Sequence, residues 1–151
     1  MLPLCKEHTQ NLLVVIVTPD DGQCETLCGL KKAFADYHIR AEIRRNIWTD
    51  ELDQLSGQYD NIIFALCRTF HRPIGPLDFW GEEATSIWAS NCSDKSKTMI
   101  LNFGVPDLYK YYKKSGYTYV NTYACTPGTI RSVVKAIMGD LKFEGKSSVR
   151  F

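Results

Sequence analysis

No apolar stretch of the sequence approaches the roughly 20 residues that a helix needs to cross a bilayer. A surplus of charge is also missing, because 18 Lys and Arg face 17 Asp and Glu, which leaves a formal net charge of +1. Non-specific binding to nucleic acid or to an anionic membrane requires a basic surplus, so neither partner is expected. Residues Met1 to His8 lack the basic-then-apolar order of a signal peptide. These absences indicate a soluble domain and leave its compartment open.

Motifs of nucleotide and hydrolytic chemistry are missing as well. The segment 18–23, which follows the first apolar run, matches neither GxGxxG nor GxxxxGK[ST], and its two carboxylates would repel a phosphate. There is no GxSxG nucleophile elbow, and the three histidines, His8, His38 and His71, stand far apart. We therefore expect no catalytic residue in this chain and no flavin or nucleotide cofactor.

The six cysteines are scattered and include no CxxC pair. Cys24 and Cys28 stand four apart and offer two metal ligands, but no His or Cys cluster supplies the others that zinc requires. A chain of this length does not depend on disulfides, so six reduced thiols, several of them buried, and no metal are expected. Cys67 as a nucleophile would need His71, and a separation of four in a loop is not a recognised catalytic geometry.

What the sequence does contain is an alternation of strand and helix patterns. Continuous apolar runs at 12–17, 61–66 and 98–103 are typical of strands covered on both faces. The segment 39–43 alternates as an edge strand does, and 117–122 is a fifth strand.

Apolar residues at helical spacing predict helices over 25–37, 49–55, 82–89 and 129–138. The candidate N-caps are Asp20 or Asp21, Thr49 or Asp50, and Thr126, which precedes Pro127. In the third helix we expect Ile87 and Trp88 to make the apolar contacts. In the last helix the expected buried stripe is Ile130, Val133, Val134 and Ile137.

This alternation predicts a single α/β domain over residues 1–151, a three-layer α/β/α sandwich with a mostly parallel, flavodoxin-like or Rossmann-like sheet of five to six strands. Ligands of such sheets bind at the carboxyl ends of the strands. The loop after the third strand carries the most polar concentration there: Arg68, Thr69, Phe70, His71 and Arg72. Arginine guanidinium groups can donate paired hydrogen bonds and a phenyl ring can stack, so this loop is predicted to contact a sugar, a carboxylate or a partner surface. The alternative is a loop whose charges face only solvent.

Two other interpretations are weaker. Asp20 and Asp21 are similar to the acidic pocket of a response-regulator receiver, but the third strand runs into Cys67-Arg68 where a receiver needs an acceptor Asp. The tyrosines between 109 and 123 could form a carbohydrate platform. Tyr117 and Tyr119 share one face of a strand, however, which favours packing in the core or at an interface.

The last third of the chain carries a recognisable pattern. The matching residues are Thr126-Pro127, Val134 to Ile137, Gly139-Asp140 and Phe143 to Lys146. With these, residues 119–146 closely resemble the C-terminal end of glycoside hydrolase family 3, most of all its bacterial β-N-acetylglucosaminidase (β-hexosaminidase) branch. Looser similarities are Leu2 to Leu4, Gly104, Pro106 and Asp107-Leu108, whereas Ser147-Ser148 replaces the Leu-Pro of the family.

The resemblance implies a supporting role. The family's nucleophile and its acid/base pair lie on an N-terminal (β/α)8 barrel, and 151 residues cannot hold a barrel of roughly 250. The catalytic Glu that the β-glucosidase branch contributes from this domain aligns with Arg68. The resemblance thus implies an accessory C-terminal domain, inactive alone, that packs on the barrel, meets carbohydrate only through the parent enzyme and borders the substrate pocket with Arg68 to Arg72. A free-standing binding or interaction module remains the alternative, with a flavodoxin-like or receiver-like signalling protein as a third.

Overall fold

The structure, a computed structural model, describes residues 2–5, 7–68 and 81–145. Its strands are β1 (Asn11–Val17), β2 (Arg40–Arg45), β3 (Asn61–Leu66), β4 (Thr98–Asn102) and β5 (Thr118–Asn121). Its helices are α1 (Asp21–Ala35), α2 (Thr49–Ser56), α3 (Glu82–Cys92), α4 (Tyr109–Tyr112) and α5 (Pro127–Ile137), with a 3-10 turn at Pro106–Leu108. All five predicted strands and all four predicted helices are present; α4 was not predicted.

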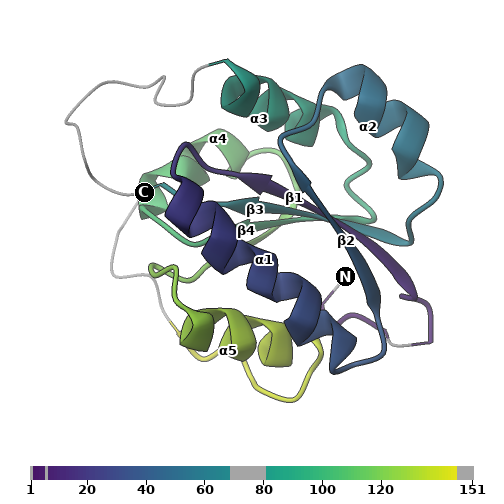
Figure 1. Cartoon of the computed structure of the whole chain (residues 1–151), viewed down its shortest axis with the longest axis vertical. Helices are drawn as coiled ribbons and strands as arrows, with labels where there is room; N and C mark the ends of the chain where they lie inside the picture. Colours follow the sequence, from purple (N-terminus) through teal and green to yellow (C-terminus); the bar gives the residue numbers. More distant parts are fainter. Residues whose placement is uncertain (1, 6, 69–80, 146–151) are drawn as a thin grey trace.

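The five strands form one parallel sheet in the order β2-β1-β3-β4-β5 (Figure 1). This is the flavodoxin-like order, in which the chain reverses direction across the sheet between β1 and β3. The predicted α/β class and mostly parallel sheet are therefore confirmed, and β2 is an edge strand as predicted. The described residues form five strands, which is the lower of the two predicted numbers.

Helices cover both faces of the sheet, which completes the three layers (Figure 1). One face packs against α1 and α5, and we call it the α1/α5 face. The other packs against α2, α3 and α4, and we call it the α2/α3 face. Alternate residues of a strand point to opposite faces, so in β1 Val14 joins the first core and Val15 the second. This double burial is why the middle residues of the three central strands are apolar, with polar residues only at the strand ends.

The helix starts confirm two predicted caps and correct a third. The Asp20 carboxylate accepts a hydrogen bond from the Gln23 N–H at 2.8 Å, and the Thr126 hydroxyl accepts one from the Thr129 N–H at 3.1 Å. The cap predicted at Thr49 or Asp50 is wrong, because α2 already includes Thr49 and its N-cap position is Trp48, without a side-chain bond. Of the described helices, none is long and apolar enough to cross a membrane.

The prediction for Trp88 is also wrong. Its side chain is 68% exposed, whereas Ile87 does pack against the core as predicted. The side of α3 that is buried against the rest of the molecule presents the small residues Ser86, Ala89 and Ser90. An apolar pair next to each other in a helix spans about 100°, so only one of the two can face the core.

Candidate functional site

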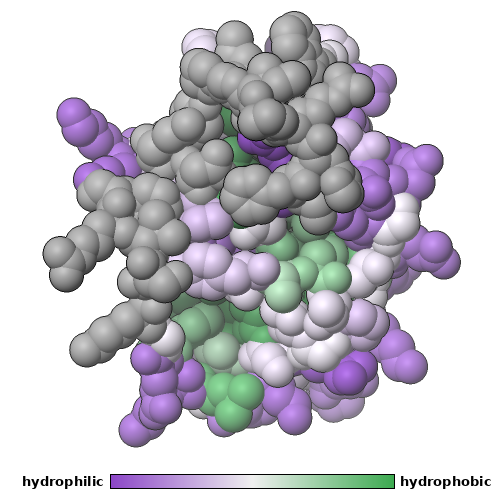
Figure 2. All heavy atoms as spheres, turned by 90° about the vertical axis from the view of Figure 1, so that its left-hand side faces the viewer, coloured by the Kyte–Doolittle hydropathy of each residue, from purple (hydrophilic) through white to green (hydrophobic). Residues whose placement is uncertain are grey.

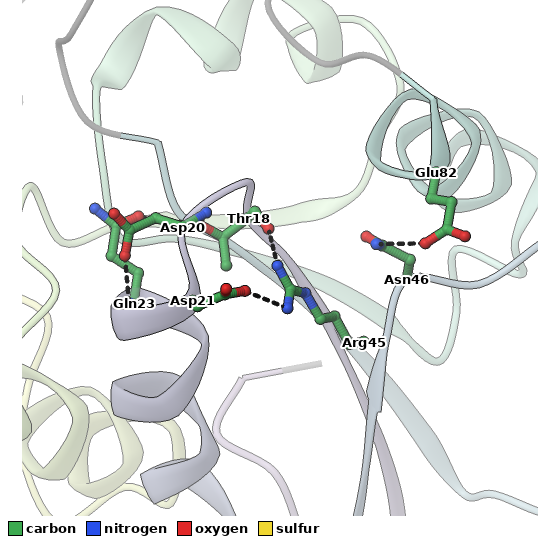
Figure 3. Close-up of polar contacts among 7 residues, drawn as sticks. All are labelled: Thr18, Asp20, Asp21, Gln23, Arg45, Asn46 and Glu82. Carbon is green, nitrogen blue, oxygen red and sulfur yellow. Dashed lines mark hydrogen bonds and ion pairs between the residues drawn. The ribbon is translucent and has the colours of Figure 1, made fainter.

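The carboxyl ends of the strands are the first place to look for a site. At the ends of β1 and β2, the Asp21 carboxylate at the start of α1 and the Arg45 guanidinium at the end of β2 point toward one another (Figure 3). Their atoms Oδ1 and Nη1 are 2.5 Å apart. A second guanidinium nitrogen donates to the Thr18 carbonyl at 3.5 Å. The hydrogen bond to Asp21 raises the pKa of Arg45 above its ordinary value, which keeps this group charged.

The two carboxylates that follow β1 therefore have structural partners. Asp20 caps α1 and Asp21 pairs with Arg45, so they do not converge on one point as the acidic pocket of a receiver requires. Within the described ranges no group of three His, Cys, Asp or Glu side chains is arranged to hold a metal ion. The pair Cys24 and Cys28 thus gains no further ligand there.

A second polar contact links the end of β2 to the start of α3. The Asn46 amide donates to the Glu82 carboxylate at 3.4 Å, and Figure 3 shows the two side chains facing each other. Just beyond, the buried Ile47 N–H donates to the Ser86 hydroxyl at 2.8 Å. Asn46 has a φ of 57°, in the left-handed region that Asn tolerates better than most residues. These contacts fix the first turn of α3 beside the sheet.

Arg68 is the one predicted site residue that the structure describes; Thr69, Phe70, His71 and Arg72 lie outside the described residues. Its carbonyl accepts a hydrogen bond from the Val105 N–H at 3.2 Å. A Cβ at Gly104 would lie 2.1 Å from the same carbonyl oxygen, so only glycine permits this approach. The backbone of Arg68 is therefore held tightly at the chain-reversal point of the sheet, while its side chain is half-buried.

The residue that organises this edge, Asn102, was missed by the sequence analysis. Its side chain is fully buried at the end of β4. Its amide nitrogen donates to the Val105 carbonyl at 2.7 Å and to the Asn121 side-chain oxygen at 3.0 Å. Its own side-chain oxygen accepts from the Gly104 N–H at 3.3 Å. The sequence did contain a signal, which is an asparagine that follows three apolar residues at the end of a strand. A buried side-chain amide needs hydrogen-bond partners, so such a residue is expected to organise the turns around it.

Tyr112, Tyr117 and Tyr119 pack against one another as predicted rather than forming an open platform, whereas Tyr123 is exposed. The ring of Tyr112 contacts the rings of Tyr117 and Tyr119, with centroids 6.3 Å and 5.7 Å apart. Tyr112 and Tyr117 are buried on the α2/α3 face, and the Tyr112 hydroxyl lies 2.8 Å from that of Ser90. Burial raises the pKa of Tyr112 to about 12. These rings serve the core.

The view onto the carboxyl edge, which is the left-hand side of Figure 1, shows hydrophobic atoms in the middle and lower part of this face and hydrophilic ones around its margin (Figure 2). On the β5 side of the molecule lies a groove of about 270 Å³ between β5, α5 and residues 141–145. Leu141 and Phe143 line the groove and are 47% and 48% exposed. Exposed apolar side chains in a groove beside an edge strand are typical of contact surfaces.

Comparisons with known proteins reveal likeness in structure and not in sequence. No protein-family model matches the sequence, and no curated protein matches it. The fold is similar to part of the beta-glucoside phosphorylase BglX, solved bound to 2FGlc, with a TM-score of 0.63 and 21% identity over 97% of the present chain. It is also similar to part of CbsA from Thermotoga neapolitana, with a TM-score of 0.59 and 12% identity over 92% of the chain.

The chain spans 27% of the length of each of these two proteins. By contrast, the chemotaxis response regulator CheY4 of Vibrio cholerae is matched over 98% of its length, with a TM-score of 0.50 and 14% identity. At these identities the comparisons establish the shared α/β fold. They also show that this fold occurs as one part of much longer proteins.

Proposed function

We propose that this chain is the C-terminal α/β domain of a family 3 glycoside hydrolase of the β-N-acetylglucosaminidase type. In this proposal it packs on a catalytic (β/α)8 barrel and borders the substrate pocket with Arg68 to Arg72. The observation that carries the proposal is the agreement of two independent similarities. The block 119–146 resembles the C-terminal end of that family, and 97% of the chain superimposes on about a quarter of a beta-glucoside phosphorylase.

The exposed apolar groove supports a docking role. Phe143 belongs to the block that carries the family resemblance, yet nearly half of its side chain faces solvent. The exposed half of this phenylalanine gains nothing from burial in the domain, whereas a contact with a barrel would bury it. In the proposed enzyme the groove beside β5 is therefore part of the surface that meets the barrel.

The geometry also supports a role without chemistry of its own. Most retaining glycosidases use two carboxyl groups about 5–5.5 Å apart at the sugar. At the described carboxyl edge, Asp20 caps a helix, Asp21 pairs with Arg45 and Glu82 accepts from Asn46. Each of these acids is engaged by the fold, and Arg68 stands where the resemblance would place a catalytic Glu.

An activity assay on two proteins tests this function. The chain alone is expected not to hydrolyse 4-nitrophenyl N-acetyl-β-D-glucosaminide. A longer protein from the same reading frame, with its barrel, is expected to hydrolyse it. Turnover by the repurified chain alone would overturn the proposal, as would a reading frame that encodes no barrel; the latter result favours the free-standing interaction module.

Variants of the longer protein distinguish a role in binding substrate from a role in docking on the barrel. Arg68→Ala is expected to raise KM about tenfold with a smaller change in kcat, since one lost charged contact to a substrate is worth about 1.4 kcal/mol or more. Phe143→Ser is expected to lower the thermal stability of the joined domains. The matched control is Trp88→Ser, which changes an exposed aromatic residue away from the groove. Equal behaviour of the two aromatic variants would contradict the docking surface.

A further inference from the structure

One long side of β2 has no partner strand. β2 is the terminal strand of the sheet, and in the part of the chain that the structure describes no strand pairs with its outer side (Figure 1). The Arg40 N–H donates to the Gln10 carbonyl at 2.9 Å and therefore faces β1. Backbone groups alternate in direction along a strand, so those of Ala41, Ile43 and Arg45 face the outer side. Such a row of N–H and C=O groups is a template for pairing with another chain.

The side chains of β2 also alternate between the two faces of the sheet. Ala41 and Ile43 pack against the core of the α1/α5 face, and Ile43 is only partly buried. Glu42 points to the α2/α3 face, where its carboxylate accepts a hydrogen bond from the Tyr59 hydroxyl at 2.7 Å. On the same face Arg44 Nη2 lies 2.8 Å from Glu42 Oε1, and the two side chains are 46% and 41% exposed. The outer edge thus presents an acid and a base side by side.

We propose that β2 docks a second copy of this chain, with the two β2 strands antiparallel and Ile43 opposite Ile43 of the second copy. Ala41 then lies opposite Arg45 of the second copy, and Glu42 lies opposite its Arg44. Hydrogen-bonded pairs alternate with non-bonded pairs in an antiparallel ladder, so the three outward-facing residues of each copy bond to those of the other. Glu42 and Arg44 occupy the non-bonded positions, where facing side chains are closest.

Backbone direction and charge together select this register. Centres at Glu42 or Arg44 are excluded, because the backbone groups of these residues face β1. A centre at Arg45 would set two arginines against each other, and like charges directly opposite are destabilising. A centre at Ala41 would carry Arg44 and Arg45 past the start of the second copy's strand. With the centre at Ile43, each Glu42 faces an arginine and no arginine faces another.

Charges on an edge strand ordinarily prevent pairing, and here they restrict the choice of partner. The three arginines of β2 would repel a basic strand, whereas a second copy supplies the matching charge twice, by two-fold symmetry. The exposed part of Ile43 is covered by its counterpart. Antiparallel pairing uses the outer side of β2 in both copies, so association ends at a dimer. The proposal does not depend on the proposed function, because the groove assigned to the barrel lies beside β5, at the other edge of the sheet.

Sedimentation velocity of the full 151-residue chain over a series of concentrations tests the dimer. A strand edge of six residues is a small interface, so the dimer is expected to dissociate on dilution. We expect half of the chains to be dimeric at a concentration between about 1 µM and 1 mM. Because the paired charges are exposed, raising the salt from about 20 mM to about 500 mM should weaken the dimer. A chain that is monomeric at every concentration up to about 1 mM would overturn the proposal.

Two charge reversals test the register. Glu42→Arg and Arg44→Glu each place like charges opposite one another, and each is expected to raise the dissociation constant about tenfold or more. In an equimolar mixture one chain presents two bases at these positions and the other presents two acids. The mixture is therefore expected to recover a heterodimer. The matched control is Lys114→Glu, which makes the same change of charge at an exposed position close to β5 and should dimerise like the unaltered chain.

A proline variant tests the hydrogen bonds of the same edge. Ile43→Pro removes the outward-facing N–H at the centre of the pair and no N–H that bonds to β1, so it is expected to stay monomeric. Circular dichroism checks that each variant is folded. A dimer that both charge reversals leave unchanged would overturn the proposal, as would a mixture of the two that stays monomeric. The mixture decides the matter even if Ile43→Pro fails to fold.

Discussion

The two faces of the sheet are covered in different ways. On the α1/α5 face, α5 buries five apolar residues: Ile130, Val133, Val134, Ala136 and Ile137. On the α2/α3 face, α3 buries Ser86, Ala89 and Ser90, and its hydroxyls bond to the backbone and to Tyr112. The first face is held by burial of apolar surface and the second also by buried hydrogen bonds. Hydrophobic periodicity therefore described α5 well and α3 poorly.

The largest effect is expected from a cavity on the α1/α5 face. Ile137→Ala removes most of a fully buried side chain, and such truncations cost about 2–5 kcal/mol. Urea unfolding followed by circular dichroism measures the loss. The matched control is Ser132→Ala, an exposed position on the same helix, where a change within about 0.5 kcal/mol is expected. Similar losses at the two positions would show that α5 does not pack by its apolar stripe.

A smaller loss is expected from a hydroxyl on the α2/α3 face. Ser86→Ala leaves the buried Ile47 N–H without its partner, and an unpaired buried donor costs about 1–3 kcal/mol. The same unfolding experiment applies. Thr85→Ala, which removes a hydroxyl bonded only to the Gly81 carbonyl of its own helix, should cost clearly less. A negligible effect of Ser86→Ala would mean that small size, not hydrogen bonding, is what α3 requires there.

The buried tyrosine of the same face predicts a pH dependence. The pKa of Tyr112 is raised to about 12 by burial, above the value of about 10 in an unfolded chain. The folded state thus favours the neutral phenol, so this contribution to stability is complete below pH 10 and is lost as the pH rises through 12.

Tyr112→Phe removes the share of Tyr112 in the alkaline slope, while Tyr37, Tyr59 and Tyr117, whose pKa values are also raised, keep theirs. It also removes the bond to Ser90, at a cost of about 1 kcal/mol at neutral pH. Urea unfolding between pH 7 and 12 checks both effects. Tyr123→Phe, at an exposed tyrosine, is the control and should keep the slope. An unchanged alkaline slope in Tyr112→Phe would contradict the assignment.

The smallest effect is expected at Trp88. Its side chain is 68% exposed, so Trp88→Ala should change the stability by no more than about 0.5 kcal/mol. Ala89→Leu, one residue further and fully buried, forces a larger side chain into the tight contact of α3 and should cost about 1–3 kcal/mol. Thermal unfolding of the pair measures this contrast. A large loss from Trp88→Ala would restore the sequence-based expectation that this residue packs inward.

The sequence pattern predicted some features of the candidate site and missed others. The position of Arg68 at the carboxyl edge follows from a strand boundary, which the apolar run 61–66 marks clearly. That its backbone packs on Gly104 and that Asn102 holds the neighbouring turn depend on three strand ends meeting in space.

Local periodicity and cap chemistry determined the strands, the helices and the parallel class of the sheet, because those signals act within a few residues of each other. Which polar groups meet was decided by the tertiary structure alone, since parallel strands bring together segments that are tens of residues apart. Pairings such as Asp21 with Arg45 and Asn102 with Asn121 exist only once β2, β1, β3, β4 and β5 lie side by side in that order.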